Sequence, residues 1–182
     1  MRIISGDLKG KKILLPKDKL TRPLKDLTKE SIFNIIKHSN LLNINIENSK
    51  ILDLFSGVGS FGLECLSRRA ISVTFIESYK EVLIVLKKNI DNKKKKNSSH
   101  VIEKDIFTKN TLEALDNKFD IIFIDPPYKE KKLSILIDEI IKFKILKNNG
   151  VIIIHRHKKE KDQFPKEFDL IVKKNYGISK II

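Results

Sequence analysis

The sequence Ile-Leu-Asp-Leu-Phe-Ser-Gly-Val-Gly-Ser-Phe-Gly at residues 51–62 decides the fold. An apolar run ends at an acid, and Gly57, Gly59 and Gly62 follow in the spacing G-x-G-x-x-G before a helical pattern begins. This order predicts a strand that turns sharply into a helix, as in the first βα unit of a nucleotide-binding sheet. We expect Gly57 to adopt a positive φ, Gly59 to let backbone approach a ligand and Gly62 to let the helix pack closely on the strand. The N–H groups at the helix start should then face the ligand, although a purely structural turn would use the same glycines.

Length and composition restrict the class of protein. The 182 residues suit one domain with a sizeable core. The formal net charge of +14 indicates a polyanionic partner such as nucleic acid, although most of the 37 basic residues are lysines, which AT-rich codon usage also enriches. A single cysteine, Cys65, forms no internal disulfide and favours a reducing cytosol. The apolar runs are too short for a transmembrane helix and the start lacks a secretory signal, so we expect a cytoplasmic protein without a membrane segment.

The remaining chain reads as an N-terminal extension, residues 1–49, followed by a main α/β domain, residues 50–182. In the extension, residues 2–5 and 11–15 predict a hairpin, and Asp26 or Thr28 is expected to cap a helix that runs to about Ser39. In the main domain, strands and helices alternate and predict a mostly parallel sheet of seven strands with helices on both faces. The last two strands are too close in sequence for a parallel crossover and should form an antiparallel hairpin. The expected strands are 50–55, 71–76, 101–103, 119–124, 151–155, 168–173 and 178–182, and the expected helices are 60–69, 79–90, 110–115 and 133–145, the last of which Asn149-Gly150 should end.

Acidic residues follow the first four strands of the main domain, at Asp53, Glu77, Asp105 and Asp125. Ligands of parallel sheets gather at the carboxyl ends of the strands, so we expect these side chains to lie together. Glu77 stands about 20 residues after Gly57, the spacing at which an acid reaches a ribose diol. Alone it would be an ordinary surface glutamate. Asp105 could accept a hydrogen bond from an adenine amino group or cap a loop.

The most specific motif in the chain is Asp125, Pro126, Pro127 and Tyr128. Two prolines fix φ and remove two backbone donors, so the segment is stiff and its carbonyls face outward. An aspartate before the prolines and an aromatic ring after them make a slot for a planar amine. A structural loop could use Pro-Pro, but it would seldom carry both flanking residues at the end of a strand.

These segments resemble motifs I, II and IV of S-adenosylmethionine-dependent amino-methyltransferases. The whole chain resembles the RsmD family of bacterial 16S rRNA (guanine-N2)-methyltransferases, and that resemblance implies a Rossmann-like class I methyltransferase fold. The chain departs from the usual family pattern at Leu24, Leu27, Lys29 and His155. The matching segments are residues 2–6 and 10–12, Arg22-Pro23, residues 30–34, 52–57, 62–64, 66–68 and 119–120, the Asp-Pro-Pro-Tyr motif, and Tyr176-Gly177.

The resemblance implies a cofactor, a partner and a set of site residues. S-adenosylmethionine is the expected cofactor and 16S rRNA in an assembling small subunit the expected partner. We expect the protein to act as a monomer without a metal. The Asp-Pro-Pro-Tyr motif would hold the target amine. The expected cofactor-binding residues are Asp53, Phe55, Ser56, Gly57, Gly59, Glu77, Asp105 and Ile106. The basic N-terminal segment supplies the expected RNA-binding residues Arg2, Lys9, Lys11, Lys12 and Arg22, although each of the lysines could also be an ordinary solvated side chain.

Three other functions are compatible with parts of the sequence. The same chemistry could act on adenine N6 of DNA or RNA, or on a protein glutamine, because the four-residue slot is shared. A dinucleotide-dependent oxidoreductase would explain the glycine motif and Glu77, but it would leave residues 125–128 without a role. A non-catalytic RNA-binding relic would explain Leu24 and Leu27, although both motifs are complete.

Overall fold

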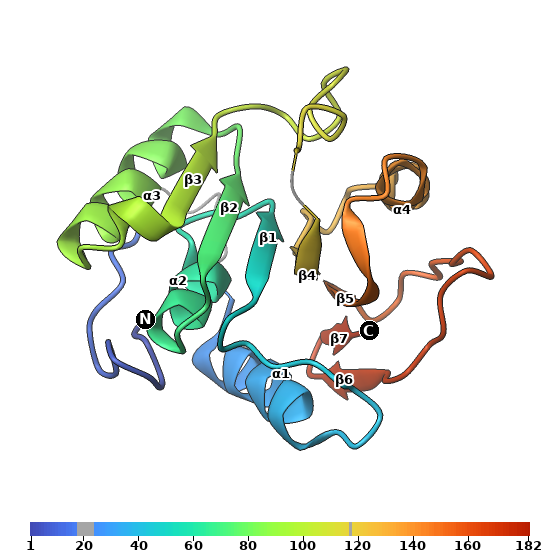
Figure 1. The fold of residues 1–182 in the computed structure, drawn as a ribbon, viewed down its shortest axis with the longest axis horizontal. Coiled ribbons are helices and arrows are strands. Elements are labelled where there is room, and N and C mark those ends of the chain that lie inside the picture. The colour runs from blue at the N-terminus through green and yellow to red at the C-terminus, as the bar shows by residue number, and fades with distance from the viewer. Residues whose placement is uncertain (18–23, 117) are drawn as a thin grey trace.

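The computed structural model describes residues 1–17, 24–116 and 118–182. Its centre is a seven-stranded sheet in the order β3-β2-β1-β4-β5-β7-β6 (Figure 1). The first five strands are parallel and the last two are antiparallel to their neighbours. The predicted α/β class, with a mostly parallel sheet and an antiparallel C-terminal hairpin, is therefore confirmed. The strands are β1 (Lys50–Leu54), β2 (Ser72–Ile76), β3 (Ser99–Ile102), β4 (Phe119–Ile124), β5 (Leu146–His157), β6 (Lys174–Tyr176) and β7 (Ser179–Ile181).

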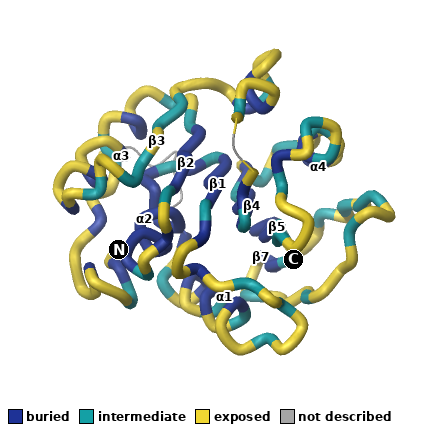
Figure 2. Tube along the Cα trace, in the orientation of Figure 1, coloured by how far each residue is buried: buried dark blue, intermediate teal, exposed yellow. Residues whose placement is uncertain are grey.

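Helices cover both faces of this sheet, and the central strands β1, β2 and β4 bury successive side chains on both sides. On one face, α1 (Asp26–His38), α2 (Ser60–Ser67) and α3 (Lys80–Asn92) pack on residues such as Ile51, Phe75 and Phe123. On the other face, α4 (Leu133–Lys142) packs on residues such as Leu52 and Ile122. A short 3₁₀ helix, η1 (Lys96–Ser98), precedes β3. The two cores make the middle of the sheet the most deeply buried part of the chain (Figure 2).

Three expected elements in the main domain differ from the structure. Residues 110–115 form turns instead of a helix. Helix α4 ends at Lys142, because Lys144 takes a left-handed φ of 52° and the chain then enters β5, so Asn149-Gly150 lies inside a strand. Strand β6 begins at Lys174, after an irregular segment over residues 168–173. Among the described residues, no helix is both long and apolar enough to cross a membrane.

The N-terminal hairpin is reduced to a single antiparallel bridge between Arg2 and Lys12. The physical reason is that several of its amides bind side chains of the main domain instead of a partner strand. Ile4 N and Ser5 N donate to the Glu64 carboxylate at 2.8 and 2.9 Å, and Leu14 N donates to Asn89 Oδ1 at 2.8 Å.

Helix α1 matches its expected range, but its expected cap is absent. Lys25 occupies the N-cap position and no side chain caps the helix. Asp26 instead lies in the first turn, where its charge favours the helix dipole. The division into residues 1–49 and 50–182 stays a proposal, since the extension packs directly on α2 and α3.

Candidate active site

A cavity of about 660 Å³ opens at the carboxyl ends of β1, β2, β4 and β5. It brings together most of the site residues predicted from the sequence, which lie as much as 75 residues apart in the chain. Leu24 and Phe61 also contribute to its wall. The predicted residues that line it are Asp53, Phe55, Ser56, Gly57, Glu77, Asp105, Asp125, Pro126, Pro127 and Tyr128.

The glycine turn has the expected backbone, but Gly59 does not border the cavity as expected. Gly57 has a φ of 55°, as predicted, and lines the cavity. A Cβ on Gly62 would lie 2.3 Å from Phe75 Cε1, so the predicted close packing of helix on strand is confirmed. A Cβ on Gly59 would lie 2.5 Å from Leu86 Cδ1, which means that this glycine serves packing against α3, and Gly59 is not among the residues that line the cavity.

Asp53 is buried beneath the turn, with 1% of its surface exposed. Its Oδ2 accepts a hydrogen bond of 3.0 Å from Gly62 N, so one of the helix-start amides expected to face a ligand binds the chain's own carboxylate. Burial raises the pKa of Asp53 well above its usual range, the Gly62 N–H opposes this, and the negative charges of Asp125 and Glu77 raise the pKa further. Asp53 therefore binds a proton more readily than an exposed aspartate does.

Glu77 holds the turn through its carboxylate. Oε2 accepts from Gly57 N, while Oε1 accepts from Ser78 N and Tyr79 N, each at 2.8 Å. A carboxylate offers about four acceptor positions. Glu77 can therefore accept from a ligand hydroxyl at the cavity and still order the loop.

After β3, Asp105 caps a loop and Phe107 forms part of the cavity wall. Asp105 Oδ1 accepts from Phe107 N at 2.9 Å, so the loop-capping interpretation of this aspartate holds, and the residue also lines the cavity. Ile106 was predicted to bind the cofactor, but it is buried in the core beneath the loop and does not line the cavity. Phe107 lines it instead, with its ring centroid 6.1 Å from that of Phe55.

The Asp-Pro-Pro-Tyr segment follows β4 and borders the same cavity. Asp125 N donates to Leu54 O at 3.4 Å, which ties the start of the motif to β1. Asp125 Oδ1 lies 2.8 Å from His155 Nδ1 on β5, and the Tyr128 ring meets the His157 ring edge-on at 5.3 Å between centroids. In the sequence, His155 is recognisable only as a departure from the usual family pattern. Its contact with Asp125 arises from the pairing of β4 with β5, which no local pattern predicts.

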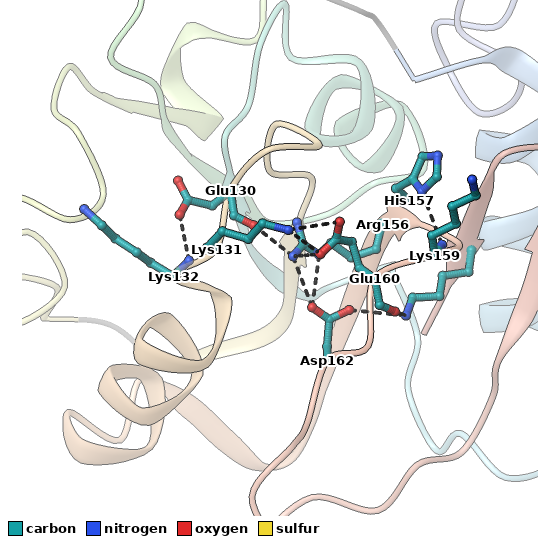
Figure 3. A network of polar contacts seen from close by, with 9 residues as sticks. Glu130, Lys131, Lys132, Arg156, His157, Lys159, Glu160 and Asp162 are labelled. Atoms are coloured by element: carbon teal, nitrogen blue, oxygen red, sulfur yellow. Dashed lines mark hydrogen bonds and ion pairs between the residues drawn. The ribbon is translucent and has the colours of Figure 1, made fainter.

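A buried ionic network supports the chain just after this motif (Figure 3). Arg156 Nη2 donates to Glu130 O at 2.9 Å and lies 3.1 Å from Asp162 Oδ1. Lys180 Nζ lies 3.2 Å from Asp162 Oδ2, and Lys131 pairs with Glu160 at 3.0 Å. Arg156 is only 2% exposed, and its bond to the Glu130 carbonyl holds a residue that lines the cavity. No sequence motif marked it, since its members come from three separate segments.

The charge of the cavity is opposite to that of the whole chain. The described residues that line it include the carboxylates of Asp53, Glu77, Asp105, Asp125 and Glu130, with Lys129 as the one lysine. Such a lining repels a pyrophosphate, which argues against a dinucleotide cofactor. It fits S-adenosylmethionine, which carries a sulfonium and an ammonium cation, a ribose diol for Glu77 to accept from, and an adenine ring that Phe55 and Phe107 can flank.

The predicted RNA-binding residues lie outside this cavity. Arg2, Lys9, Lys11 and Lys12 are exposed on the N-terminal segment, and Arg22 lies outside the described residues. The segment packs through Ile3, Leu8 and Ile13 on Val58 and Val82, two residues that also line the cavity. The described part of the chain contains no group of three or more His, Cys, Asp or Glu side chains placed to hold a metal ion.

Comparisons with known proteins agree with this architecture. A protein called ribosomal RNA small subunit methyltransferase D from Buchnera aphidicola (subspecies Acyrthosiphon pisum) is 37% identical over 176 residues, which cover 94% of this chain and 86% of that one. The protein of the same name from Haemophilus influenzae is 32% identical over 183 residues, covering 98% and 90%. The solved structure of yhhF from Escherichia coli superimposes with a TM-score of 0.81 at 27% identity, covering 100% and 94%.

The sheet order and these relatives identify the fold as that of class I methyltransferases, with S-adenosylmethionine as the methyl donor. The model of the family described as Conserved hypothetical protein 95 matches residues 1–182. This chain therefore belongs to that family, which confirms the resemblance to RsmD proteins seen in the sequence.

Proposed function

We propose that the protein transfers a methyl group from S-adenosylmethionine to the exocyclic N2 amine of a guanine in 16S rRNA. One observation carries the proposal: the Asp-Pro-Pro-Tyr segment and the glycine turn with Glu77 border one acidic cavity. The names of the relatives supply the substrate class. A cytoplasmic location, a monomeric enzyme and a substrate within an assembling small subunit are parts of the same proposal.

In this mechanism the residues of the motif orient the target amine. When bound, the cofactor supplies a methyl carbon that its sulfonium has already activated. The Asp125 carboxylate and the Pro126 carbonyl accept the two N2 hydrogens and direct the nitrogen lone pair at that carbon. Tyr128 stacks on the flipped-out base, which is worth roughly 1–3 kcal/mol. Holding the reacting atoms in line can lower the barrier by about 7–11 kcal/mol.

The reaction then needs only one group transfer and one proton release. The amine nitrogen would take the methyl carbon of a cofactor held by the glycine turn and Glu77, while the sulfur would keep the electrons of the broken S–C bond and positive charge would pass to nitrogen. Asp125 stabilises the charge that develops on the amine. The proton leaves the nitrogen afterwards, to Asp125 or to water, and gives the neutral methylated guanine.

Replacement of Asp125 tests the proposed role of the motif. Asp125→Ala should lower the rate of methyl transfer at least about a hundredfold, because it removes the acceptor for the amine. Binding of S-adenosylmethionine, measured by calorimetry, should weaken much less than the rate falls, since the turn and Glu77 are untouched. Asp169→Ala, on an exposed loop, is the matched control. Full methylation by Asp125→Ala would contradict the assignment.

A substrate panel separates the alternative amines. The protein is incubated with labelled S-adenosylmethionine and, in separate reactions, with assembled small subunits, naked 16S rRNA, duplex DNA and a peptide release factor. Label on guanine N2 supports the proposal. Label only on adenine or on a protein glutamine would replace it with the corresponding alternative, and the difference between subunits and naked RNA identifies the preferred substrate.

A further inference from the structure

His155 reaches the proposed catalytic motif from the neighbouring strand. Strands β4 and β5 are parallel, and Ile124 lies opposite Ile154. The next residue after each isoleucine is Asp125 or His155, so these two residues lie side by side. His155 Nδ1 lies 2.8 Å from Asp125 Oδ1, and the two side chains are 11% and 22% exposed. Both residues line the cavity.

The contact determines where the imidazole carries its hydrogen. An ionised carboxylate can only accept hydrogen bonds, so Nδ1 must carry a proton and donate it to Oδ1. In the neutral ring, Nε2 is then the unprotonated nitrogen. The donation holds Asp125 in one orientation and leaves its second oxygen available for a target amine.

We propose that His155 is a positioning residue that makes methyl transfer depend on pH: its neutral form orients Asp125, and its protonated form weakens the reaction. This inference rests on the proposed function of Asp125. An imidazolium beside Asp125 neutralises the charge that would stabilise the developing positive amine. It also adds a cation to a cavity whose expected cofactor is itself cationic, so protonation should oppose both cofactor binding and methyl transfer.

Several other charged or titratable groups lie around His155. Asp125 on β4 is its direct partner, while Asp53 and Glu77 line the same cavity from β1 and β2. On β5 itself, Arg156 is engaged with Asp162 in the network of Figure 3, and His157 packs on Tyr128. In general, histidine is the side chain whose charge changes near neutral pH, and the two histidines on β5 are His155 and His157. The other charged residues that line the cavity are Asp105 after β3, and Lys129 and Glu130 after the motif, while Lys180 on the neighbouring β7 is paired with Asp162.

The test compares single-turnover methylation rates from pH 5 to pH 9 in five proteins: the natural protein and the variants His155→Leu, His155→Asn, His157→Asn and His100→Asn. The natural protein should lose rate as pH falls, by about tenfold per pH unit below the transition. His155→Leu removes the donor and should be slower by about tenfold or more at high pH, and without a titrating ring it should lack the acidic decline. His155→Asn keeps a donor near the position of Nδ1 but does not titrate, so it should recover much of that loss and lack the acidic decline. His100→Asn, an exposed histidine on β3, should behave as the natural protein does.

A measurement without substrate makes the outcome independent of activity. In the ligand-free protein, the NMR titration of the His155 ring should move when Asp125 is replaced by Asn. The proposal is overturned if His155→Asn keeps the acidic decline, if His155→Leu retains the full rate, or if only His157→Asn abolishes the decline. A natural protein that methylates none of the substrates at any pH would refute the proposed function instead, and the NMR titration would still report whether His155 and Asp125 interact.

Discussion

At the scale of single residues, the cavity by itself disfavours the charged form of a buried carboxyl group, and a bound cation would favour it. Asp53 illustrates this, because burial and two neighbouring carboxylates raise its pKa while only the Gly62 N–H favours its charged form. The folded protein therefore binds the Asp53 proton more tightly than the unfolded chain does. Stability is lost as pH rises from the unfolded pKa of about 3.9 towards the raised folded value.

The variant Asp53→Asn should remove this pH-dependent loss. Asparagine can still accept a hydrogen bond from Gly62 N but cannot ionise. The melting temperature of the cofactor-free variant should therefore rise relative to that of the natural protein as the pH is raised from 5 to 8. Each kcal/mol of this difference corresponds to about 2–4 °C for a chain of this size. Thermal denaturation by circular dichroism at both pH values measures it. A gap between the two proteins that stays equal at both pH values would contradict a raised pKa.

At the scale of elements, the N-terminal extension is attached through a buried pair. The Glu64 and Lys29 side chains are both fully buried, with Oε2 and Nζ 3.6 Å apart. Lys29 Nζ also donates to Arg2 O at 2.7 Å, while Glu64 accepts from Ile4 N and Ser5 N. Burial lowers the pKa of Lys29, and the Glu64 charge opposes that change. This pair joins α1, α2 and the first residues of the chain.

Glu64→Ala should therefore destabilise the protein by about 3–5 kcal/mol, because it leaves the buried Lys29 with only the partly exposed Asp26, 3.7 Å from its Nζ, as a carboxylate partner. Urea unfolding measures the loss. Amide exchange at Ile4 and Ser5 should accelerate, since both donors lose their acceptor. Glu47→Ala is the matched control, because Glu47 is half-exposed and pairs with Arg69 at 3.6 Å, an arrangement worth at most about 1 kcal/mol. Equal effects of the two changes would show that the buried pair does not anchor the extension.

At the scale of the whole molecule, charge is segregated. The chain carries a formal net charge of +14, yet its cavity is lined mainly by carboxylates. The N-terminal segment contributes exposed cations beside the cavity, and the positive charge of Lys11, together with burial, lowers the pKa of Lys93 at the end of α3. The arrangement suits a cationic cofactor inside the cavity and a polyanion across its outer rim.

Replacement of Lys9, Lys11 and Lys12 by alanine should weaken RNA binding and reduce its dependence on salt. Each lost phosphate contact lowers the slope of log K against log salt by about 1. Binding to a 16S rRNA fragment across a range of salt concentrations measures the slope. The matched control replaces Lys166, Lys173 and Lys174, which are exposed near the opposite edge of the sheet. If both triple variants change the slope equally, the N-terminal segment is not a specific RNA-binding surface.

The sequence by itself determined the features that depend on neighbouring residues: the strand–turn–helix at residues 51–62, the alternation of strands and helices, the C-terminal hairpin and the stiff Asp-Pro-Pro-Tyr segment. Periodicity, glycine and proline specify these within a few residues. The tertiary structure alone decided that Gly59 packs on Leu86, that Ile106 belongs to the core and that His155 contacts Asp125. These outcomes depend on which strands pair and in what register, and a parallel sheet brings together residues too far apart in the chain for any local pattern to relate them.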